Sequence, residues 1–534
     1  MKKLLLIPSP AIWPLFEYEI DLLQSAIDDN YEIYYSFCKS KYKSCIANKE
    51  KATHVFNPFL CQRCENRSTN GLKLLDPQSK VNLLINEKYI NFDEFKIITN
   101  KVKLLLESNL INIKLIRNIV NIDNSDIYEA ALSTLMTTLS DSEPDLRIHN
   151  SLFYEYIYEA LDTHFFYKKY LKENLFDRII IFNGRTSRYR PILRLCQNYK
   201  LDCEVLEYPE LTFDRYLLTK NKYPHDFSNR SINFRNFIDN QTIERTTILN
   251  EGERLIKDSI NQKENHGIGI INYVSDQLKN KLPENWDENR FNISFFTSSD
   301  YENAAIYEYY NDIPGGSQLA TIKGLRNLLP NKIKFNIRIH PNLKFKDLNA
   351  VAKIENLESE NINIIRAKDQ IDSYYLALKS NVIITFGSQL SIESAFLGKQ
   401  VIVFGNSYYS AFNFSKNLNN FNDAAILISN LFEKGINFFD DYNKVKEEAC
   451  LAMFARKYEG TQTKYLKKDS YYGGKFLING NESRITINRN IYIITKYLGA
   501  PIVLYNLYKT GGFVKILTLL KDLLTKKTIT NVKN

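Results

Sequence analysis

The chain has 534 residues, of which 44% are hydrophobic and 25% are charged. This length exceeds one ordinary hydrophobic core, so we expect at least two domains, and the composition excludes a disordered protein. The net charge of +9 is concentrated in residues 484–534, which hold nine Lys or Arg residues and one acid. The rest of the chain is almost neutral, which argues against a basic face for nucleic acid, so we expect no nucleic-acid partner.

A short apolar run at residues 4–7 near the start of the chain is ended by Pro8. Four apolar residues are too few for the core of a signal peptide, and no stretch approaches the roughly 18 apolar residues of a membrane-spanning helix. We therefore interpret residues 4–7 as a buried strand and expect a cytoplasmic protein.

The first 215 residues alternate strand and helix patterns, which predicts an N-terminal α/β domain. The predicted strands are 4–7, 32–37, 178–182 and 203–206, and the predicted helices are 15–26 and 190–199. The helical pattern between about 85 and 175 predicts an insertion that elaborates the edge of the sheet. Residues 216–285 are polar without a strong apolar strand, so we expect them to connect two domains.

Residues 286–445 contain five apolar runs separated by helical or crossover segments. The runs are 291–297, 333–339, 362–365, 382–386 and 401–404. Strands that alternate with helices predict a parallel, doubly wound, Rossmann-like sheet with right-handed crossovers. Residues 446–534 are predicted to form a C-terminal extension.

Polar clusters follow three of these predicted strands. They are Ser298, Ser299 and Glu302 after the first strand, His340 and Pro341 after the second, and Gly387, Ser388 and Gln389 after the fourth. Ligands of doubly wound sheets bind beyond the carboxyl ends of the strands. We therefore expect the three clusters to converge on one binding site.

The glycine and serine at 387–388 precede a predicted helix and are suited to phosphate. Gly387 lets the backbone approach an anion closely, and Ser388 can cap the helix or donate to phosphate. Glu393, about one helical turn further, can accept hydrogen bonds from ribose hydroxyls. The alternative interpretation is an ordinary helix cap followed by a surface glutamate.

His340 ends a predicted strand, and Pro341 restricts it to an extended conformation. In that position His340 can donate to a phosphate or a nucleobase carbonyl, with Ser298 and Ser299 as further donors. A structural histidine at the end of a strand and a serine-rich turn are the alternatives.

These strings together resemble bacterial capsule polysaccharide biosynthesis proteins, which are GT-B-type glycosyltransferases that include Kdo transferases. The resemblance covers about residues 290–410. It lies in Phe-Phe-Thr-Ser-Ser-Asp-Tyr-Glu at 295–302, Arg-Ile-His-Pro-Asn at 338–342, Asp-Ser-Tyr-Tyr at 372–375 and Ser-Asn-Val-Ile-Ile-Thr-Phe-Gly-Ser at 380–388, with Glu393 and a weaker match at 183–185 and Glu207.

The resemblance implies two Rossmann-like domains that face a cleft. It implies a nucleotide-sugar donor, such as CMP-Kdo, in the C-terminal domain and a saccharide or lipid-linked acceptor mainly in the N-terminal one. Kdo and sialic acid transferases contact cytidine monophosphate with a His-Pro pair, which His340 and Pro341 match.

Residues that follow the N-terminal strands would supply the acceptor side of the cleft. Arg185, with Arg188 and Arg190 nearby, can hold an anionic acceptor or a donor carboxylate, because guanidinium binds such groups bidentately. Glu207 is the candidate general base for an inverting transfer, with a solvated acid as the alternative. We predict Arg185, Glu207 and His340 as catalytic residues and expect no catalytic metal.

Four of the seven cysteines, Cys38, Cys45, Cys61 and Cys64, fall within 27 residues. The last two form a C-x2-C step, which suits zinc, and a cytoplasmic location argues against disulfides. The spacing of the four is not that of a standard zinc finger. The two hypotheses are a structural zinc site on these cysteines and four free thiols.

The basic segment 484–534 contains apolar residues at helical spacing. They are Phe513, Ile516, Leu517, Leu520, Leu523 and Leu524, with lysines off this stripe. A basic amphipathic helix predicts either peripheral attachment to the inner face of the cell membrane or packing across the domains.

Three functions fit these patterns. The first is a metal-independent glycosyltransferase that uses a nucleotide sugar. The second is a nucleotide-sugar epimerase of the same fold, against which the long insertion and the basic tail argue. The third is a non-catalytic component of a polysaccharide export assembly that binds a nucleotide or a glycan.

Overall fold

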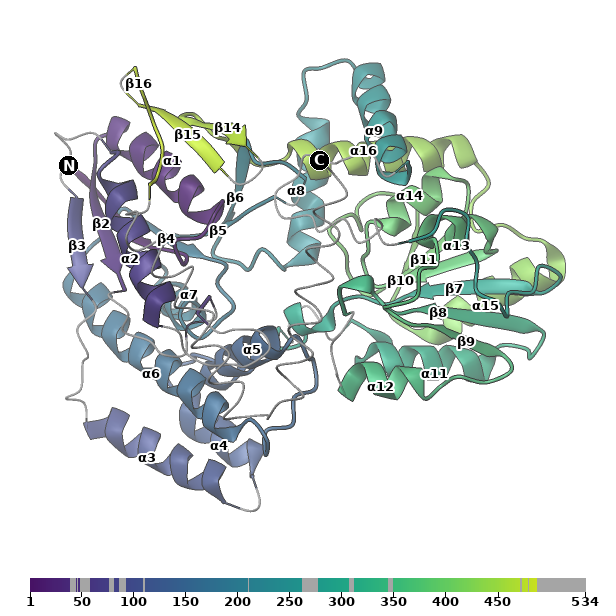
Figure 1. Cartoon of the computed structure of the whole chain (residues 1–534), viewed down its shortest axis with the longest axis horizontal. Helices are drawn as coiled ribbons and strands as arrows, with labels where there is room; N and C mark the ends of the chain where they lie inside the picture. Colours follow the sequence, from purple (N-terminus) through teal and green to yellow (C-terminus); the bar gives the residue numbers. More distant parts are fainter. Residues whose placement is uncertain are drawn as a thin grey trace.

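The computed structural model describes residues 1–38, 45, 47–48, 58–75, 81–85, 93–108, 111–209, 211–261, 277–306, 312–343, 349–470, 473–478 and 480–486. These residues form two α/β lobes that lie side by side, each built around its own mainly parallel sheet (Figure 1). The predicted fold class, with two doubly wound Rossmann-like sheets and a helical insertion, is confirmed.

The N-terminal sheet has the strand order β13-β6-β5-β4-β1-β2-β3. Its strands are β1 (Lys2–Ile7), β2 (Tyr31–Phe37), β3 (Val81–Ile85), β4 (Arg178–Phe182), β5 (Cys203–Glu207), β6 (Arg215–Lys220) and β13 (Thr461–Gln462). The strands β1 to β5 run parallel, whereas β6 and β13 are antiparallel to their neighbours. Successive residues of β1 face opposite sides, so Leu4 packs with α1 (Leu15–Asp28) and Leu5 with α7 (Arg190–Asn198).

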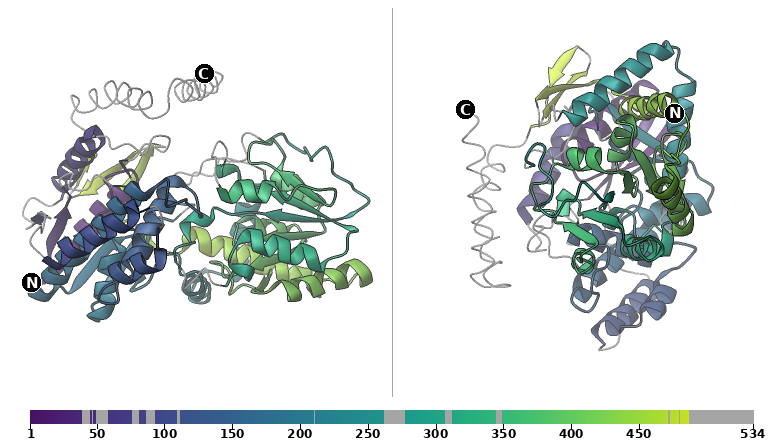
Figure 2. Two further views of the ribbon diagram at one scale, coloured as in Figure 1. Left: turned by 90° about the horizontal axis from the view of Figure 1, so that it is seen from below. Right: turned by 90° about the vertical axis from the view of Figure 1, so that its right-hand side faces the viewer.

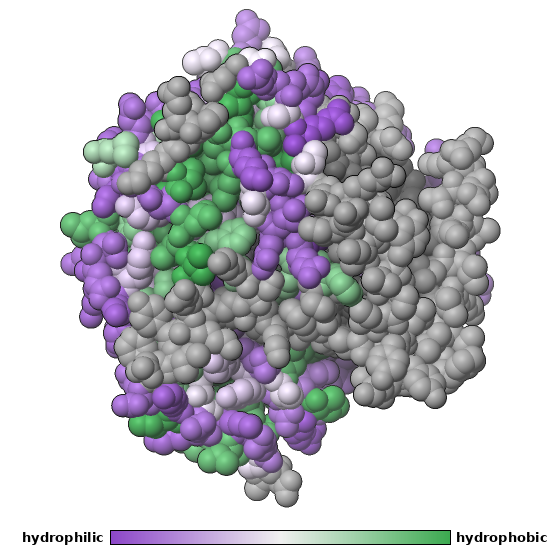
Figure 3. Space-filling model, turned by 60° about the vertical axis from the view of Figure 1, so that its left-hand side comes forward, coloured by the Kyte–Doolittle hydropathy of each residue, from purple (hydrophilic) through white to green (hydrophobic). Residues whose placement is uncertain are grey.

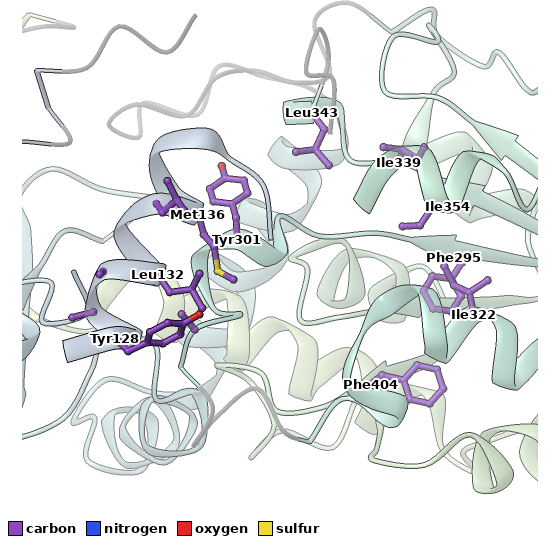
Figure 4. Close-up of a cluster of buried hydrophobic side chains, with 14 of the residues drawn as sticks. Tyr128, Leu132, Met136, Phe295, Tyr301, Ile322, Ile339, Leu343, Ile354 and Phe404 are labelled. Atoms are coloured by element: carbon purple, nitrogen blue, oxygen red, sulfur yellow. The ribbon is translucent and has the colours of Figure 1, made fainter. Parts of the chain in front are cut away.

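The predicted insertion is helical and lies between β3 and β4. Its described helices are α3 (Asp93–Glu107), α4 (Ile113–Val120), α5 (Ile127–Leu139) and α6 (Asn150–Glu173), and α2 (Pro58–Leu72) precedes β3. Buried residues of the insertion share one hydrophobic cluster with the C-terminal sheet. Figure 4 shows Leu132 and Met136 of α5 beside Tyr301 of the C-terminal lobe. The insertion therefore packs between the lobes as well as against its own sheet.

The C-terminal sheet is parallel throughout, in the order β12-β11-β10-β7-β8-β9. Its strands are β7 (Phe291–Phe296), β8 (Ile333–Arg338), β9 (Ile362–Ile365), β10 (Val382–Thr385), β11 (Gln400–Phe404) and β12 (Lys416–Leu418). One face is covered by α11 (Gln318–Leu328), α12 (Asn349–Glu355) and α15 (Phe421–Lys434), and the other by α13 (Ser373–Lys379) and α14 (Leu390–Phe396). The five predicted strands are confirmed, and β12 is an additional edge strand.

Two segments of the chain cross between the lobes. Helices α8 (Phe227–Asp239) and α9 (Arg245–Ile260) follow β6 and pack on the C-terminal lobe with α16 (Tyr442–Tyr458). Beyond α16 the chain returns to the N-terminal lobe, where β13 pairs with β6.

These crossings correct two predicted boundaries. Strand β6 extends into segment 216–285, where no strand was expected, and segment 446–534 begins inside α16 instead of forming a separate extension. The sequence pattern missed β6 because this strand lies near the edge of the sheet. Its residues Arg215, Thr219 and Lys220 are only partly buried or exposed, so no continuous apolar run marks it.

A small antiparallel sheet from the C-terminal segment packs on the N-terminal lobe (Figures 1 and 2). It consists of β14 (Leu466–Ser470), β15 (Gly473–Ile478) and β16 (Asn481–Ser483). The carboxylate of Asp21 on α1 accepts hydrogen bonds from the backbone N–H groups of Lys464, Tyr465 and Leu466, at 3.2, 2.6 and 2.8 Å. Burial raises the pKa of Asp21 to about 6, although these bonds partly offset the effect.

The outer surface of the N-terminal lobe carries a band of hydrophobic side chains bordered by hydrophilic ones (Figure 3). Within the described part of the chain, no helix has both the length and the apolar character needed to span a membrane. The apolar stripe predicted at 513–524 lies outside the described residues, so peripheral membrane attachment through 484–534 stays a prediction.

The close packing of α9 on α16 makes the fold sensitive to Gly252. A Cβ atom added there would lie 2.2 Å from the backbone carbonyl oxygen of Cys450 in α16. Because backbone cannot move as a side chain can, we expect Gly252→Ala to lower the free energy of unfolding by about 1–3 kcal/mol. Urea denaturation would measure this loss. Glu253→Ala, on the more exposed side of the same helix, should stay within about 0.5 kcal/mol of the wild type. Equal stability of both variants would contradict the packing.

Candidate functional site

The two lobes meet at a cavity of about 600 Å³ that is lined by residues of both. The strand order of each sheet reverses beside this cavity, between β1 and β4 in the N-terminal lobe and between β7 and β10 in the C-terminal lobe. Residues that follow β4, β5, β7, β8 and β10 line its walls. Doubly wound sheets bind their ligands at such switch points, so this cavity is the candidate site.

The C-terminal wall gathers most of the residues that the strand ends predicted. Those that line the cavity are Ser298, Ser299, Glu302, His340, Gly387, Ser388 and Gln389. They come from three loops that are far apart in sequence, after β7, β8 and β10. The structure therefore brings the three predicted clusters together.

The loop after β10 places backbone and a hydroxyl at the cavity. Gly387 has φ +82°, a left-handed conformation that side chains disfavour, and a Cβ there would lie 3.4 Å from the Cβ of Ser407. Ser388 Oγ accepts a hydrogen bond from the Leu390 N–H at 3.3 Å, which leaves its own proton to donate. Tyr409 donates to the Ser388 carbonyl at 2.9 Å and holds the loop in place. Such a loop suits a phosphate oxygen.

His340 is held by the residue that follows the neighbouring strand β7 and by its own turn. Its backbone N–H donates to Thr297 Oγ1 at 3.0 Å, and its Nδ1 accepts from the Asn342 N–H at 3.1 Å. An Nδ1 that accepts places the proton of the neutral imidazole on Nε2, which makes Nε2 a donor. Pro341 does not line the cavity; it begins the short 3-10 turn Pro341–Leu343 that brings Asn342 back to the histidine.

Glu393 lies outside the cavity, against the expectation of a ribose contact. Its Oε1 accepts hydrogen bonds from Ser259 at 2.5 Å, Gln389 at 2.6 Å and Tyr374 at 3.1 Å. Burial raises the pKa of the carboxyl group, although these donors partly offset the rise. One turn of α14 rotates this side chain toward α9 and α13, so the structure ties Glu393 to the packing behind the phosphate-suited loop.

Glu207 faces the cavity from the N-terminal wall, at the end of β5. Its two carboxylate oxygens accept from Asn183 Nδ2 at 2.6 Å and from the Tyr208 N–H at 3.1 Å. Burial raises the pKa of Glu207 above its ordinary value, and these two donors with the charges of Arg185 and Arg230 partly offset the rise. The carboxylate is therefore oriented and has an increased proton affinity, as a general base requires.

Arg185 lines the same wall but is largely occupied in joining the lobes. Its Nη1 donates to the Glu302 carbonyl at 3.0 Å and to Thr137 Oγ1 at 3.0 Å. Its Nε is buried and has no hydrogen-bond partner among the described residues. Arg190, expected nearby, is buried behind the wall and donates to the Ala305 carbonyl at 2.9 Å.

Among the cavity-lining residues that sequence patterns missed are His225, Arg230, Tyr408 and Arg456. His225 and Arg230 lie in the polar connection and Arg456 lies in α16, where no predicted strand end marks them, and Tyr408 lies in the loop after β11. Only the two crossings between the lobes bring them together. Arg230 and Arg456 are far apart in the chain, and no sequence motif indicates that they share a site.

Comparison with known proteins gives structural matches only. No protein-family profile and no curated protein matches the sequence. Among solved structures, the chain is similar to a beta Kdo 2,4 transferase, KpsC of Thermosulfurimonas dismutans, with 15% identity over 59% of this chain and 87% of that chain and a TM-score of 0.34. A beta Kdo 2,7 transferase KpsC of the same organism matches with 13% identity over 62% and 88% and a TM-score of 0.32.

A UDP-GlcNAc 2-epimerase from Neisseria meningitidis, bound to UDP-GlcNAc, also matches, with 12% identity over 84% of this chain and 94% of that chain and a TM-score of 0.25. Kdo transferases, which the sequence resemblance named, are thus among the matching structures. The structure of the chain itself shows two doubly wound α/β lobes on either side of one cavity, which is the architecture expected from the sequence. Because these TM-scores lie below 0.5, we base its function on the geometry of its own cavity.

The cysteines predicted to bind zinc lie beside the N-terminal lobe, away from the cavity lining. Cys61 Sγ accepts from Asn48 Nδ2 at 2.8 Å, and Cys64 Sγ accepts from the Ala11 N–H at 3.3 Å. Burial raises the pKa of Cys64 to about 11. Within the described ranges, no group of three or more His, Cys, Asp or Glu residues is arranged to hold a metal ion. Zinc on Cys38, Cys45, Cys61 and Cys64 stays a prediction without support from this structure.

We expect His225 to remain neutral at acidic pH. Burial lowers its pKa well below the ordinary value of 6.5, and the neighbouring charges of Arg185 and Arg230 lower it further. In two-dimensional NMR of the imidazole nitrogens, its signals should keep neutral-form shifts from pH 8 down to pH 5.5. His225→Gln would assign the signals by their loss, and a midpoint near 6.5 would contradict the electrostatic picture.

Proposed function

We propose that this chain is a glycosyltransferase that moves a sugar from a nucleotide-sugar donor to a saccharide or lipid-linked acceptor without a catalytic metal. The observation that carries this proposal is the single cavity between the lobes. A phosphate-suited loop lies on one wall of that cavity and a carboxylate with raised pKa on the other. A transfer reaction needs a group that binds the leaving phosphate on one side of the transferred sugar and a base that activates the acceptor on the other.

The C-terminal wall would hold the donor. Donor phosphate oxygens would bind the loop of Gly387 and Ser388, and His340 Nε2–H would donate to the leaving phosphate or to the nucleobase. Such donors stabilise the charge that develops on the leaving group. The match of His340 and Pro341 to a His-Pro pair supports a cytidine nucleotide, and we propose CMP-Kdo or a related donor on that basis.

The N-terminal wall would activate the acceptor. For transfer with inversion, Glu207 takes the proton of the acceptor hydroxyl while the hydroxyl oxygen forms a bond to the anomeric carbon of the donor sugar. The bond from that carbon to the phosphate oxygen breaks at the same time, and the nucleotide leaves with the electron pair. Asn183 and the Tyr208 N–H orient the carboxylate for this step.

A panel of nucleotides tests donor binding. At a nucleotide concentration 100 times its Kd, binding stabilises a protein by about 2.7 kcal/mol, so the melting temperature rises clearly. We expect CMP to raise it more than UDP or GDP, and His340→Ala to reduce that rise. A preference for UDP would exclude a CMP donor, and no response to any nucleotide would overturn the proposed function.

Glu207→Gln tests the transfer step. Loss of a general base lowers rates by about 10²–10⁴-fold, so acceptor-dependent release of nucleotide from the donor should fall by that factor. The melting-temperature rise with nucleotide should remain, because Glu207 lies on the opposite wall. Glu204→Gln is the matched control, since Glu204 lies on the same strand and pairs with Arg178 away from the cavity.

Three outcomes would contradict the assignment. Unchanged release of nucleotide by Glu207→Gln would exclude Glu207 as the base. Conversion of a nucleotide sugar to its epimer without acceptor would identify an epimerase, and nucleotide binding without either reaction would identify a binding component.

A further inference from the structure

A glutamine of the cavity wall is oriented by a buried carboxylate. Gln389 follows Ser388 in the phosphate-suited loop and lines the cavity, whereas Glu393, one turn further along the chain, does not. The side-chain nitrogen of Gln389, Nε2, donates to Glu393 Oε1 at 2.6 Å and to Ser259 Oγ at 3.1 Å. The amide of Gln389 therefore reaches from the cavity wall into a polar network behind it.

The network behind Gln389 is anchored in three helices. Ser259 belongs to α9, Tyr374 to α13 and Glu393 to α14. Ser259 and Tyr374 donate to Glu393 Oε1 at 2.5 and 3.1 Å. The side chain of Glu393 is buried, so its carboxylate needs such donors from the protein. The network holds Glu393 Oε1 in place and, through it, the amide nitrogen of Gln389.

The chemistry of the two partners decides which end of the Gln389 amide faces this network. An ionised carboxylate can only accept hydrogen bonds, so the amide nitrogen must face Glu393 and the carbonyl oxygen must face away. The reversed amide would place its oxygen against a carboxylate oxygen, and the two would repel each other. The pairing with Glu393 thus settles an orientation that the shape of a glutamine side chain leaves open.

The carbonyl oxygen of Gln389, Oε1, is an accessible acceptor. Within the described part of the chain no group donates to it, and it is not one of the buried polar atoms that lack a partner. Because Gln389 lines the cavity, Oε1 can accept from a molecule bound there. Ser388 Oγ, on the preceding residue, has a proton to donate. The loop thus offers a donor and an acceptor on consecutive residues.

This acceptor separates two kinds of ligand group. A phosphate oxygen and a carbonyl oxygen both lack a proton to share, so a phosphate belongs with Ser388 and the backbone at Gly387. A hydroxyl group can donate to Gln389 Oε1. Consecutive Cα atoms lie about 3.8 Å apart, so this hydroxyl would belong to a sugar joined directly to the phosphate.

We propose that Gln389 Oε1 accepts a hydrogen bond from a substrate hydroxyl, on a sugar joined to the phosphate that the loop of Gly387 and Ser388 would hold. Glu393 is the positioning residue, because it acts on the substrate only through Gln389. This inference rests on the proposed function and adds a specificity-determining contact to it. The hydroxyl comes from the ribose of the nucleotide or from the transferred sugar, since both are joined to phosphate in a nucleotide sugar.

Removal of the acceptor tests the contact in the full-length protein. Calorimetry measures the Kd of CMP, UDP and GDP, of their 2′-deoxy and 3′-deoxy forms, and of CMP-Kdo and UDP-GlcNAc. We expect Gln389→Met, which keeps the length of the side chain, to weaken at least one bound ligand about 3- to 10-fold, as the loss of one neutral hydrogen bond does. Gln241→Met is the matched control, since Gln241 Nε2 donates to the Phe237 carbonyl away from the cavity.

The deoxynucleotides distinguish the two sources of the hydroxyl. If ribose supplies it, one deoxy form binds the wild type about 3- to 10-fold more weakly than its ribonucleotide, and the difference disappears in Gln389→Met. If the transferred sugar supplies it, nucleotides bind both proteins equally and only the nucleotide sugar loses affinity. Equal affinity of both proteins for every ligand would overturn the contact, as would an equal loss for a ribonucleotide and its deoxy forms.

Two variants test the positioning role of Glu393. Glu393→Leu removes the acceptor that orients Gln389, so it should weaken the same ligand as Gln389→Met does. Glu393→Gln keeps a carbonyl oxygen that can accept from Gln389, so it should bind this ligand like the wild type. An equal loss in both variants, or no loss in either, would overturn the positioning role. If Glu393→Leu does not fold, Gln389→Met still decides the contact.

The two proposals fail differently. If no nucleotide and no nucleotide sugar binds the wild type, both are overturned. If Gln389→Met binds every ligand like the wild type while sugar is transferred, only the contact fails. If a nucleotide binds through Gln389 but no sugar is transferred, the proposed function fails and the contact stands.

Discussion

The site depends on two buried guanidinium groups of the N-terminal lobe that bind carbonyl oxygens of the C-terminal lobe. Arg190, 1% exposed, donates to the Ala305 carbonyl, and Arg185, 7% exposed, donates to the Glu302 carbonyl. Burial of Asp126 acts to raise the pKa of its carboxyl group. The hydrogen bonds and ion pairs of Asp126 with Arg190 and Arg194 have the larger effect and hold this pKa well below its ordinary value. Because an unpaired buried charge is costly, these contacts hold the loop after β7 against the N-terminal lobe and so set the width of the cavity.

This constraint explains why the chemistry is divided between the lobes. Each sheet presents the carboxyl ends of its central strands at a switch point, and the interlobe contacts place the two switch points face to face. The phosphate-suited loop at Gly387 and the oriented carboxylate of Glu207 then line one cavity.

The buried strands and the residues that follow them were predictable because both depend on local pattern. Continuous apolar runs marked β4 and β10, and an apolar-rich run marked β7. Polar residues after these strands, such as Ser298 and Ser388, lie where the doubly wound topology requires. Strand β6 escaped prediction because it pairs near an edge and needs few apolar residues. Glu393, expected to reach a ribose because of its spacing from Gly387 along the helix, does not line the cavity, since packing against Ser259 and Tyr374 sets its direction.

By itself, the sequence determined the alternation of strands and helices, the division into two doubly wound sheets and the candidate residues at the strand ends, since hydrophobic periodicity and turn chemistry act over a few residues. Only the tertiary structure decided which side chains face one another across the lobes. Arg230 and Arg456 are far apart in the chain, and their joint position over Tyr408 follows from two crossings whose geometry depends on the packing of α8, α9 and α16. Which residues line the cavity is therefore a property of that packing.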